Sequence, residues 1–158
     1  MIRITREADY GFVLMTCLAQ ADGQPRSAAA LAQQRQLPLP MVSKILKALA
    51  RAGLLISQRG AQGGYNLARS AVDISAADII SALEGPIAIT ECSDEIHDGC
   101  VRQDYCEMSG HWSRINQAIY TALRNISLLE MSRPDPIRPL HFHPLHRAMT
   151  ASTAGRPV

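Results

Sequence analysis

The segment PMVSKILKALARA, residues 40–52, limits the fold of this chain more than any other because its two faces differ in chemistry. Apolar residues recur at spacings of three and four, which predicts one buried helical face. These residues are Val42, Ile45, Leu46 and Leu49. The opposite face is polar and basic, Pro40 suits the first helical position, and Gly53 ends the helix. We therefore expect a helix that packs on a core and offers positive charge outward.

The segments on either side of residues 40–52 complete a recognisable order. Apolar spacing predicts a helix over residues 7–21, and Ser27 is a suitable N-cap for a short helix over 28–36. After residue 53 the sequence predicts a strand over 54–58, a glycine-rich turn and a second strand over 65–68. Three helices followed by a hairpin are typical of a winged helix-turn-helix domain. The predicted class is mainly α with a small β-wing.

Charge is distributed unevenly along the chain although the net charge is only +2. Residues 1–69 carry nine Lys and Arg against three acids, whereas residues 70–111 carry nine acids against one Arg. A basic N-terminal part suits a polyanion such as DNA, and an ordinary solvated surface is the alternative. No apolar stretch is long enough to span a membrane, and the first residues show no secretory signal, so we expect a cytoplasmic protein.

The second half of the chain predicts a helix, a long loop and another helix. A capping box at Ser75 and Asp78 opens a helix that runs to about Leu83, and residues 91–111 read as an acidic loop. From residue 112 to 131 apolar residues repeat with the 4-3 spacing of a coiled-coil seam. They are Ile115, Ile119, Ala122, Ile126 and Leu129. We predict a long C-terminal dimerisation helix; packing of this seam on its own domain is the alternative.

Three cysteines, Cys92, Cys100 and Cys106, fall within fifteen residues of the acidic loop. The loop lacks the closely spaced cysteine pair of most zinc sites, and its wider spacing favours an iron–sulfur cluster. Zinc and unmetallated thiols remain open from the spacing alone. A fourth ligand is needed, and the candidates are Asp9, Glu7, His97 and His111. Asp9 has the alternative role of stabilising the N-terminus of the first helix, and Cys17 is predicted to pack in the core.

The expected DNA contacts lie on the outer face of the helix over 40–52 and in the glycine-rich wing. The candidate residues are Pro40, Ser43, Lys44, Lys47, Arg51, Arg59 and Gln62. Lysine and arginine give salt-dependent affinity for phosphates, whereas base choice needs hydrogen bonds to base edges. A solvated basic helix beside a hairpin is the alternative for this surface. No nucleophile elbow, P-loop or dinucleotide fingerprint is present, so we do not expect an enzyme or a small-molecule substrate.

The run RGAQGGYNL, the helix-turn-helix before it and the three cysteines before a long helix resemble the IscR, NsrR and SUF-regulator family, the Rrf-two family. The resemblance covers about residues 1–131. Within the family, MIRITREADYG and the AITEC and HWSRINQAI segments are most similar to proteobacterial regulators of the SUF cluster-assembly operon.

This resemblance implies a homodimeric repressor or dual regulator that binds a near-palindromic double-stranded DNA operator and controls SUF-type iron–sulfur cluster assembly genes. It also implies a cluster on Cys92, Cys100 and Cys106, with a two-iron form expected over a four-iron form. IscR-like members use a histidine at the position of Ser109, so that ligand does not carry over. NsrR-like members use an acid of the partner subunit that matches Asp9, which we rank ahead of His111.

Two functions rival this hypothesis: a redox or nitric-oxide sensor on the same scaffold, and a zinc-stabilised interaction module. We divide the chain into a DNA-binding domain (1–70), a cluster-binding loop with its dimerisation helix (71–131), and a disordered tail (132–158). The tail holds five of the nine prolines and no periodic apolar pattern. We expect its histidines to be solvated, and metal binding is the alternative. These histidines are His141, His143 and His146.

Overall fold

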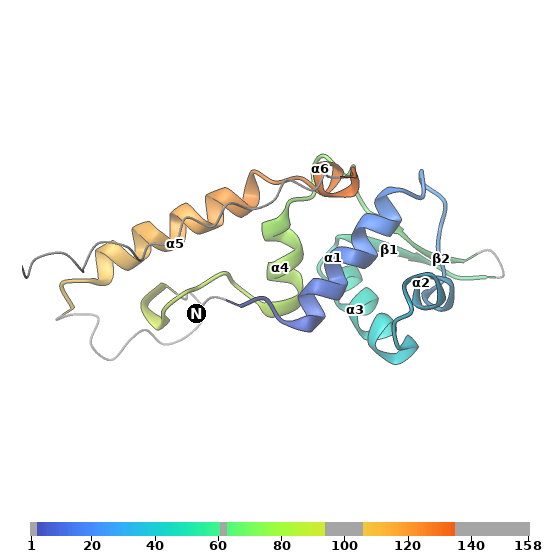
Figure 1. Ribbon diagram of the computed structural model, residues 1–158, viewed down its shortest axis with the longest axis horizontal. Helices are drawn as coiled ribbons and strands as arrows, with labels where there is room; N and C mark the ends of the chain where they lie inside the picture. Colours follow the sequence, from blue (N-terminus) through green and yellow to red (C-terminus); the bar gives the residue numbers. More distant parts are fainter. Residues whose placement is uncertain (1–2, 61–62, 94–105, 135–158) are drawn as a thin grey trace, which may run out of the picture.

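The computed structural model describes residues 3–60, 63–93 and 106–134. Three helices, a hairpin and a fourth helix follow one another along the chain, as the sequence predicts. Their bounds are α1 (Arg6–Ala19), α2 (Ala28–Arg35), α3 (Leu39–Arg51), β1 (Leu55–Gln58), β2 (Gly64–Leu67) and α4 (Ala76–Glu84). A short 3-10 turn η1 (Glu91–Ser93) and two helices, α5 (Ser109–Arg124) and α6 (Leu128–Ser132), follow. Figure 1 shows their arrangement.

Helix α1 is the centre of the N-terminal part because α2, α3, α4, α6 and β2 all contact it. Its N-cap is Thr5, whose hydroxyl accepts a hydrogen bond from the Ala8 N–H. Gly11 lies on the buried side, and a Cβ there would collide with the Leu83 side chain of α4. The absence of a side chain at Gly11 therefore lets α1 and α4 approach closely. Cys17 is buried in this core, where the Arg35 guanidinium donates to its sulfur, and its predicted packing role is confirmed.

Helices α2 and α3 form the helix-turn-helix. The turn begins at Gln36, which adopts the left-handed conformation that ends α2 and whose N–H returns to carbonyls of the last turn. Helix α3 begins at Leu39, one residue before the predicted start, so that Pro40 occupies the second position, where its missing N–H also costs nothing. The predicted inner face of α3 is confirmed. Its residues Val42, Ile45, Leu46 and Leu49 are completely buried.

The wing is an antiparallel pair in which Leu55 faces Leu67 and Gln58 faces Gly64. A third segment joins it, because Arg26 and Tyr65 exchange two backbone hydrogen bonds of 3.0 and 2.9 Å. No sequence pattern predicts this bridge, since a single paired residue has no alternation of its own. The bridge attaches the wing to the segment that leads into α2.

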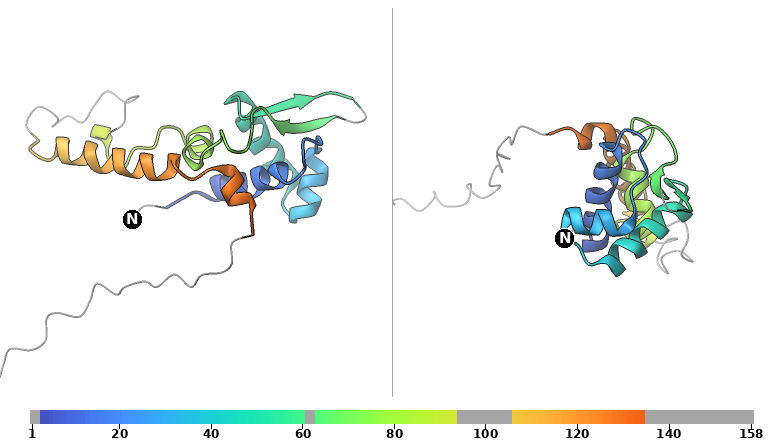
Figure 2. Two further views of the ribbon diagram at one scale, coloured as in Figure 1. Left: turned by 90° about the horizontal axis from the view of Figure 1, so that it is seen from above. Right: turned by 90° about the vertical axis from the view of Figure 1, so that its right-hand side faces the viewer.

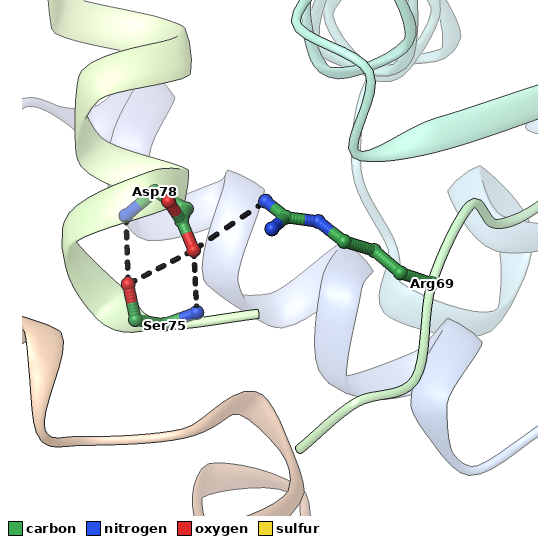
Figure 3. A network of polar contacts seen from close by, with 3 residues as sticks. All are labelled: Arg69, Ser75 and Asp78. Carbon is green, nitrogen blue, oxygen red and sulfur yellow. Dashed lines mark hydrogen bonds and ion pairs between the residues drawn. The ribbon is translucent and has the colours of Figure 1, made fainter. Parts of the chain in front are cut away.

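Helix α4 begins at the capping box that the sequence predicts. The Ser75 hydroxyl accepts from the Asp78 N–H at 3.2 Å, and the Asp78 carboxylate accepts from the Ser75 N–H at 2.9 Å. Arg69, at the end of the wing, pairs with the same carboxylate at 3.5 Å, as Figure 3 shows. This network fixes the start of α4 relative to the end of the wing.

The predicted continuous helix over 112–131 is wrong, because the chain breaks between α5 and α6. The break has a tertiary cause: backbone groups around Ser127 bond to the segment before α4 instead of extending α5. The Leu128 N–H donates to the Ile74 carbonyl at 2.7 Å, and the Ala76 N–H donates to the Ile126 carbonyl at 2.9 Å. Ser127 then caps α6, and the Leu128 side chain is completely buried. Ile126 and Leu129 thus lie outside α5, and the predicted seam is interrupted.

One hydrophobic core includes residues of α1, α2, α3 and β1 together with Ile74, Ile79 and Leu128. This core spans the boundary that we predicted at residue 70. Figures 1 and 2 show α5 extending from one end of the molecule and the wing projecting at the other end. Among the described residues no helix has the length and apolar character needed to cross a bilayer.

Candidate nucleic-acid interface and cysteine segment

The outer face of α3 carries the polar residues that the sequence proposes for DNA. Burial of the opposite face against α1 and α2 fixes which side chains point outward. Pro40, Lys44, Lys47 and Arg51 are exposed, and Ser43 is half-buried. The helix therefore presents a cationic ridge with Ser43 at its edge. Such a ridge has the chemistry to contact phosphates and base edges in a major groove.

Lys44 differs from the other cations of this ridge. Its ammonium group lies 2.7 Å and 3.1 Å from the two carboxylate oxygens of Glu7, in the first turn of α1. Among the described residues, Lys47 and Arg51 have no ion-pair partner. The sequence suggests Glu7 only as a metal ligand and does not reveal this pair, because a contact between residues 37 positions apart leaves no local signal.

The wing brings a further cation to the tip of the hairpin. Arg59 is exposed directly after β1, and Gly60 next to it has a φ of +116°. A side chain at Gly64 would collide with the backbone of Arg26, so the glycine is needed for the close approach of that segment. Gln62, the other predicted wing contact, lies outside the described residues.

The cysteine segment is described only at its two ends. Cys92 lies in η1, which packs against α5, and Cys106 is half-buried three residues before α5 begins. The Cys106 carbonyl accepts from both the N–H and the hydroxyl of Ser109, at 3.2 and 3.0 Å. Cys100 and His97 lie outside the described residues. Within the described part of the chain no group of three potential metal ligands converges.

The candidates for the fourth ligand that the structure describes lie on two helices. Asp9 is exposed in the first turn of α1, and the cap of that helix is Thr5, so Asp9 adds only a favourable charge near the N-terminus. Among the described residues its carboxylate has no hydrogen-bond or ion-pair partner. His111 is exposed in the first turn of α5. Of these candidates, Glu7 is engaged with Lys44.

The residues predicted for dimerisation divide between exposed and half-buried positions. Ile115 of α5 is 43% exposed, Ile126 is 39% exposed, and Ala122 is also exposed. Ile119 is half-buried beside the α4 side of the helix, and Leu129 is half-buried in α6. Helix α5 as a whole contains no fully buried residue. An apolar face is thus left uncovered over much of its length.

Sequence reasoning also missed Asn116, whose side chain ties α5 to the segment before the cysteines. Its amide group donates to the Ile87 carbonyl at 2.9 Å and accepts from the Ile89 N–H at 3.2 Å. A polar residue on the half-buried side of an amphipathic helix is the signal that could have identified it.

Comparisons with known proteins agree with this arrangement. Residues 4–134 match the family model described as "Rrf2: Iron-dependent Transcriptional regulator". Protein rrf2 of Nitratidesulfovibrio vulgaris is 31% identical over 139 residues, which cover 87% of this chain and 92% of that protein. The matched family consists of transcriptional regulators, which supports the expectation that this chain is not an enzyme.

Two solved structures resemble the chain closely. The structure of CymR, described as the global cysteine regulator of B. subtilis, has a TM-score of 0.64 and 31% identity, covering 84% of this chain and 97% of that one. The structure of T. potens IscR has a TM-score of 0.62 and 32% identity, covering 82% of this chain and 85% of that one. The predicted winged-helix fold is thus confirmed by similarity to both.

Proposed function

Because the chain belongs to the Rrf2 family of transcriptional regulators, we propose that it senses iron–sulfur clusters through Cys92, Cys100 and Cys106 and represses SUF-type cluster assembly genes. The coarser part of this function, DNA binding by a winged-helix regulator, follows from family membership. The observation that carries the finer part is the presence of three cysteines within fifteen residues of sequence, of which Cys106 lies just before α5. The chain is similar both to IscR and to CymR, and CymR is described as a cysteine regulator. The three cysteines are therefore the feature on which we base the choice of a cluster sensor.

The donor set fits an iron–sulfur cluster in its chemistry. Thiolates are the usual ligands of such clusters, and the half-buried Cys106 combines access with partial protection from water. A bound cluster would supply a group whose presence depends on iron supply and oxidants.

The exposed carboxylate of Asp9 supports its role as the fourth ligand, donated to the cysteines of a partner subunit. Asp9 is not needed as a helix cap, because Thr5 has that role, and no described residue occupies its carboxylate. An oxygen ligand matches iron less well than a thiolate does, so the cluster is expected to be labile. His111 is the alternative ligand.

A chain of packed elements connects the cysteines with the DNA face. Segment η1 contacts α5, α5 contacts α4, and α4 contacts α3. Cluster binding at one end of this series can therefore shift the orientation of α3 at the other end. By linkage, DNA that favours the cluster-bound form raises the affinity for the cluster by the same factor.

A homodimer completes the proposed regulator. The uncovered apolar face of α5 supports an isologous interface, which would place two copies of α3 on a two-fold symmetric operator. In this arrangement residues 1–70 contact DNA, and residues 71–131 hold the cluster and the interface. The tail that we predicted to begin at residue 132 has no proposed role; Ser132 belongs to α6, and residues 135–158 lie outside the described residues.

The test is anaerobic purification followed by measurement of iron, acid-labile sulfide, zinc and the absorption spectrum. The proposal expects stoichiometric iron and sulfide in the wild type and their loss in Cys106→Ser. The matched control is Cys17→Ala, which removes a buried cysteine far from the loop in sequence and should retain the cluster. Zinc without sulfide, or equal iron in Cys106→Ser, would contradict the proposal.

The target genes need a separate measurement. Electrophoretic mobility shifts with the chain's own SUF-type promoter should show different affinities for the cluster-bound and the metal-free protein. Equal affinity of both forms for that promoter, and for unrelated DNA, would contradict cluster-dependent control.

A further inference from the structure

The side chain of Asn116 holds a piece of irregular backbone, residues 87–89, against α5. Its Nδ2 group donates to the Ile87 carbonyl at 2.9 Å, and its Oδ1 accepts from the Ile89 N–H at 3.2 Å. Both polar ends of one amide are thus used on two residues that are nearly thirty positions earlier in the chain. The Asn116 side chain thus forms the hydrogen bonds to the Ile87 carbonyl and the Ile89 N–H that a neighbouring strand would otherwise form.

Open cavities adjoin the segment 86–89 on two sides, and Ile87, Ala88 and Ile89 are half-buried between them. One of about 400 Å³ lies between α4 and α5, and Ser81, Ser93 and Tyr120 line it together with Pro86. The second, of about 430 Å³, is lined by the same segment together with residues that include Ile4 and Ile119. Among the described residues, the two hydrogen bonds from Asn116 are the polar contacts that hold residues 87–89 on α5.

The restrained segment leads directly to the cysteines. Cys92 follows Ile89 by three residues, and Cys106 is bonded through its carbonyl to Ser109 at the start of the same helix. Both ends of the stretch from Cys92 to Cys106 are therefore attached to α5. The Cys106 end is attached by the hydrogen bonds of its carbonyl to Ser109, the first residue of α5. The Cys92 end depends on Asn116 and on the contact of η1 with α5.

We propose that Asn116 is a positioning residue for the cysteine site: by fixing residues 87–89 on α5 it holds Cys92 at a set distance from Cys106 before any metal binds. This inference rests on the proposed function, since it assigns Asn116 a role toward the same cysteines. A donor set that is already positioned loses less conformational freedom when it binds. Residues that orient metal ligands typically change metal affinity by about 10–100-fold when they are removed.

The experiment compares Asn116→Ala with Gln117→Ala. The neighbouring Gln117 is the matched control because it is also an amide on α5, and among the described residues its Nε2 bonds only to Thr121 of the same helix, at 3.3 Å. The first measurement is amide hydrogen exchange of Ile89 in the metal-free protein. The second is the half-life of the cluster absorption band in the presence of an iron chelator.

In Asn116→Ala we expect faster exchange at Ile89 and a cluster half-life shortened by about tenfold or more. Gln117→Ala should match the wild type in both measurements. If the cluster of Asn116→Ala has the same half-life as that of the wild type, the inference is overturned. Unchanged amide exchange at Ile89 would overturn it as well. A circular dichroism spectrum like that of the wild type checks that the metal-free variant is folded.

A second variant, Asn116→Asp, covers the case in which alanine prevents folding. It preserves the size of the side chain and the acceptor for the Ile89 N–H, but it places a carboxylate oxygen against the Ile87 carbonyl. We again expect a shorter half-life, and an unchanged one would contradict the inference. If the wild type binds no iron and sulfide, the proposed function fails, and the exchange of Ile89 still decides whether Asn116 restrains the segment.

Discussion

At the scale of single residues, Glu7 lowers the positive charge that α3 offers to DNA. Its carboxylate neutralises Lys44 in the free protein, although the lysine side chain is 72% exposed. A phosphate that contacts Lys44 must therefore displace or share this carboxylate. Exposed ion pairs of this kind are worth about 0.2–1 kcal/mol, so the competition is modest and measurable.

We predict that Glu7→Gln binds DNA more tightly than the wild type at low salt, by about two- to fivefold, on any sequence. The measurement is a fluorescence anisotropy titration at several salt concentrations. Asp73→Asn is the control because it makes the same change in net charge at an exposed position in the loop that joins β2 to α4. Weaker binding by Glu7→Gln would show instead that Glu7 orients Lys44 for DNA.

We propose that α3 and the wing contact DNA, and among the described residues Lys47 and Arg59 are cations of these two elements without an ion-pair partner. Replacing either by alanine should weaken binding at all sequences and reduce the slope of log K against log salt by about one for each phosphate that the variant no longer contacts. Unchanged affinity for both variants, measured in the same titrations, would remove α3 and the wing as the DNA face.

At the scale of elements, local signals and tertiary contacts act on different helices. Helix α4 begins where its capping box predicts, because Ser75 and Asp78, three residues apart, satisfy each other's backbone groups. The helix predicted over residues 112–131 breaks because backbone groups of residues 126–129 find partners in the segment before α4. The 4-3 spacing of apolar residues carried no information about those partners.

Ser75→Ala should lower the free energy of unfolding by about 1 kcal/mol, since it removes the N-cap of α4. Chemical denaturation monitored by circular dichroism measures the loss. Arg69→Ala is the comparison, because its ion pair with Asp78 is partly exposed and should contribute less than the cap. A larger loss for Arg69→Ala than for Ser75→Ala would contradict this order.

Leu128→Ala should destabilise the protein by about 2–5 kcal/mol, because the side chain is completely buried and its removal leaves a cavity. Denaturation in urea gives the value, and Leu39→Ala, at an exposed position of α3, is the control. A loss below about 1 kcal/mol would show that α6 does not belong to the core in solution.

At the scale of the whole molecule, the interface that we propose along α5 can be tested by mutation. Ile115 is the better position for a charge, because Ile119 also lies beside α4 and its replacement would disturb the monomer. We expect Ile115→Asp to yield folded monomers in analytical ultracentrifugation, with a circular dichroism spectrum like that of the wild type. A dimer that survives this change would place the interface elsewhere.

Most of the fold can be predicted from the sequence because its signals act over a few residues. The inner face of α3, the capping box of α4 and the hairpin each depend on side chains and backbone that are close along the chain. For the same reason the sequence predicted correctly that Lys44, Lys47 and Arg51 of α3 are exposed. Ser43, which was expected on the same face, is half-buried at its edge. The resemblance of the wing and the three cysteines to one family identified the regulator class, which the family match confirms.

Only the tertiary structure decided the features that join distant segments. The pairing of Lys44 with Glu7, the break between α5 and α6, and the hold of Asn116 on residues 87–89 each link residues far apart in sequence. The sequence by itself determined which surfaces are apolar or charged and which segment carries potential metal ligands, since composition and spacing set these properties. Which of those surfaces meet depends on how the helices pack, because packing selects one set of partners from many that local spacing allows.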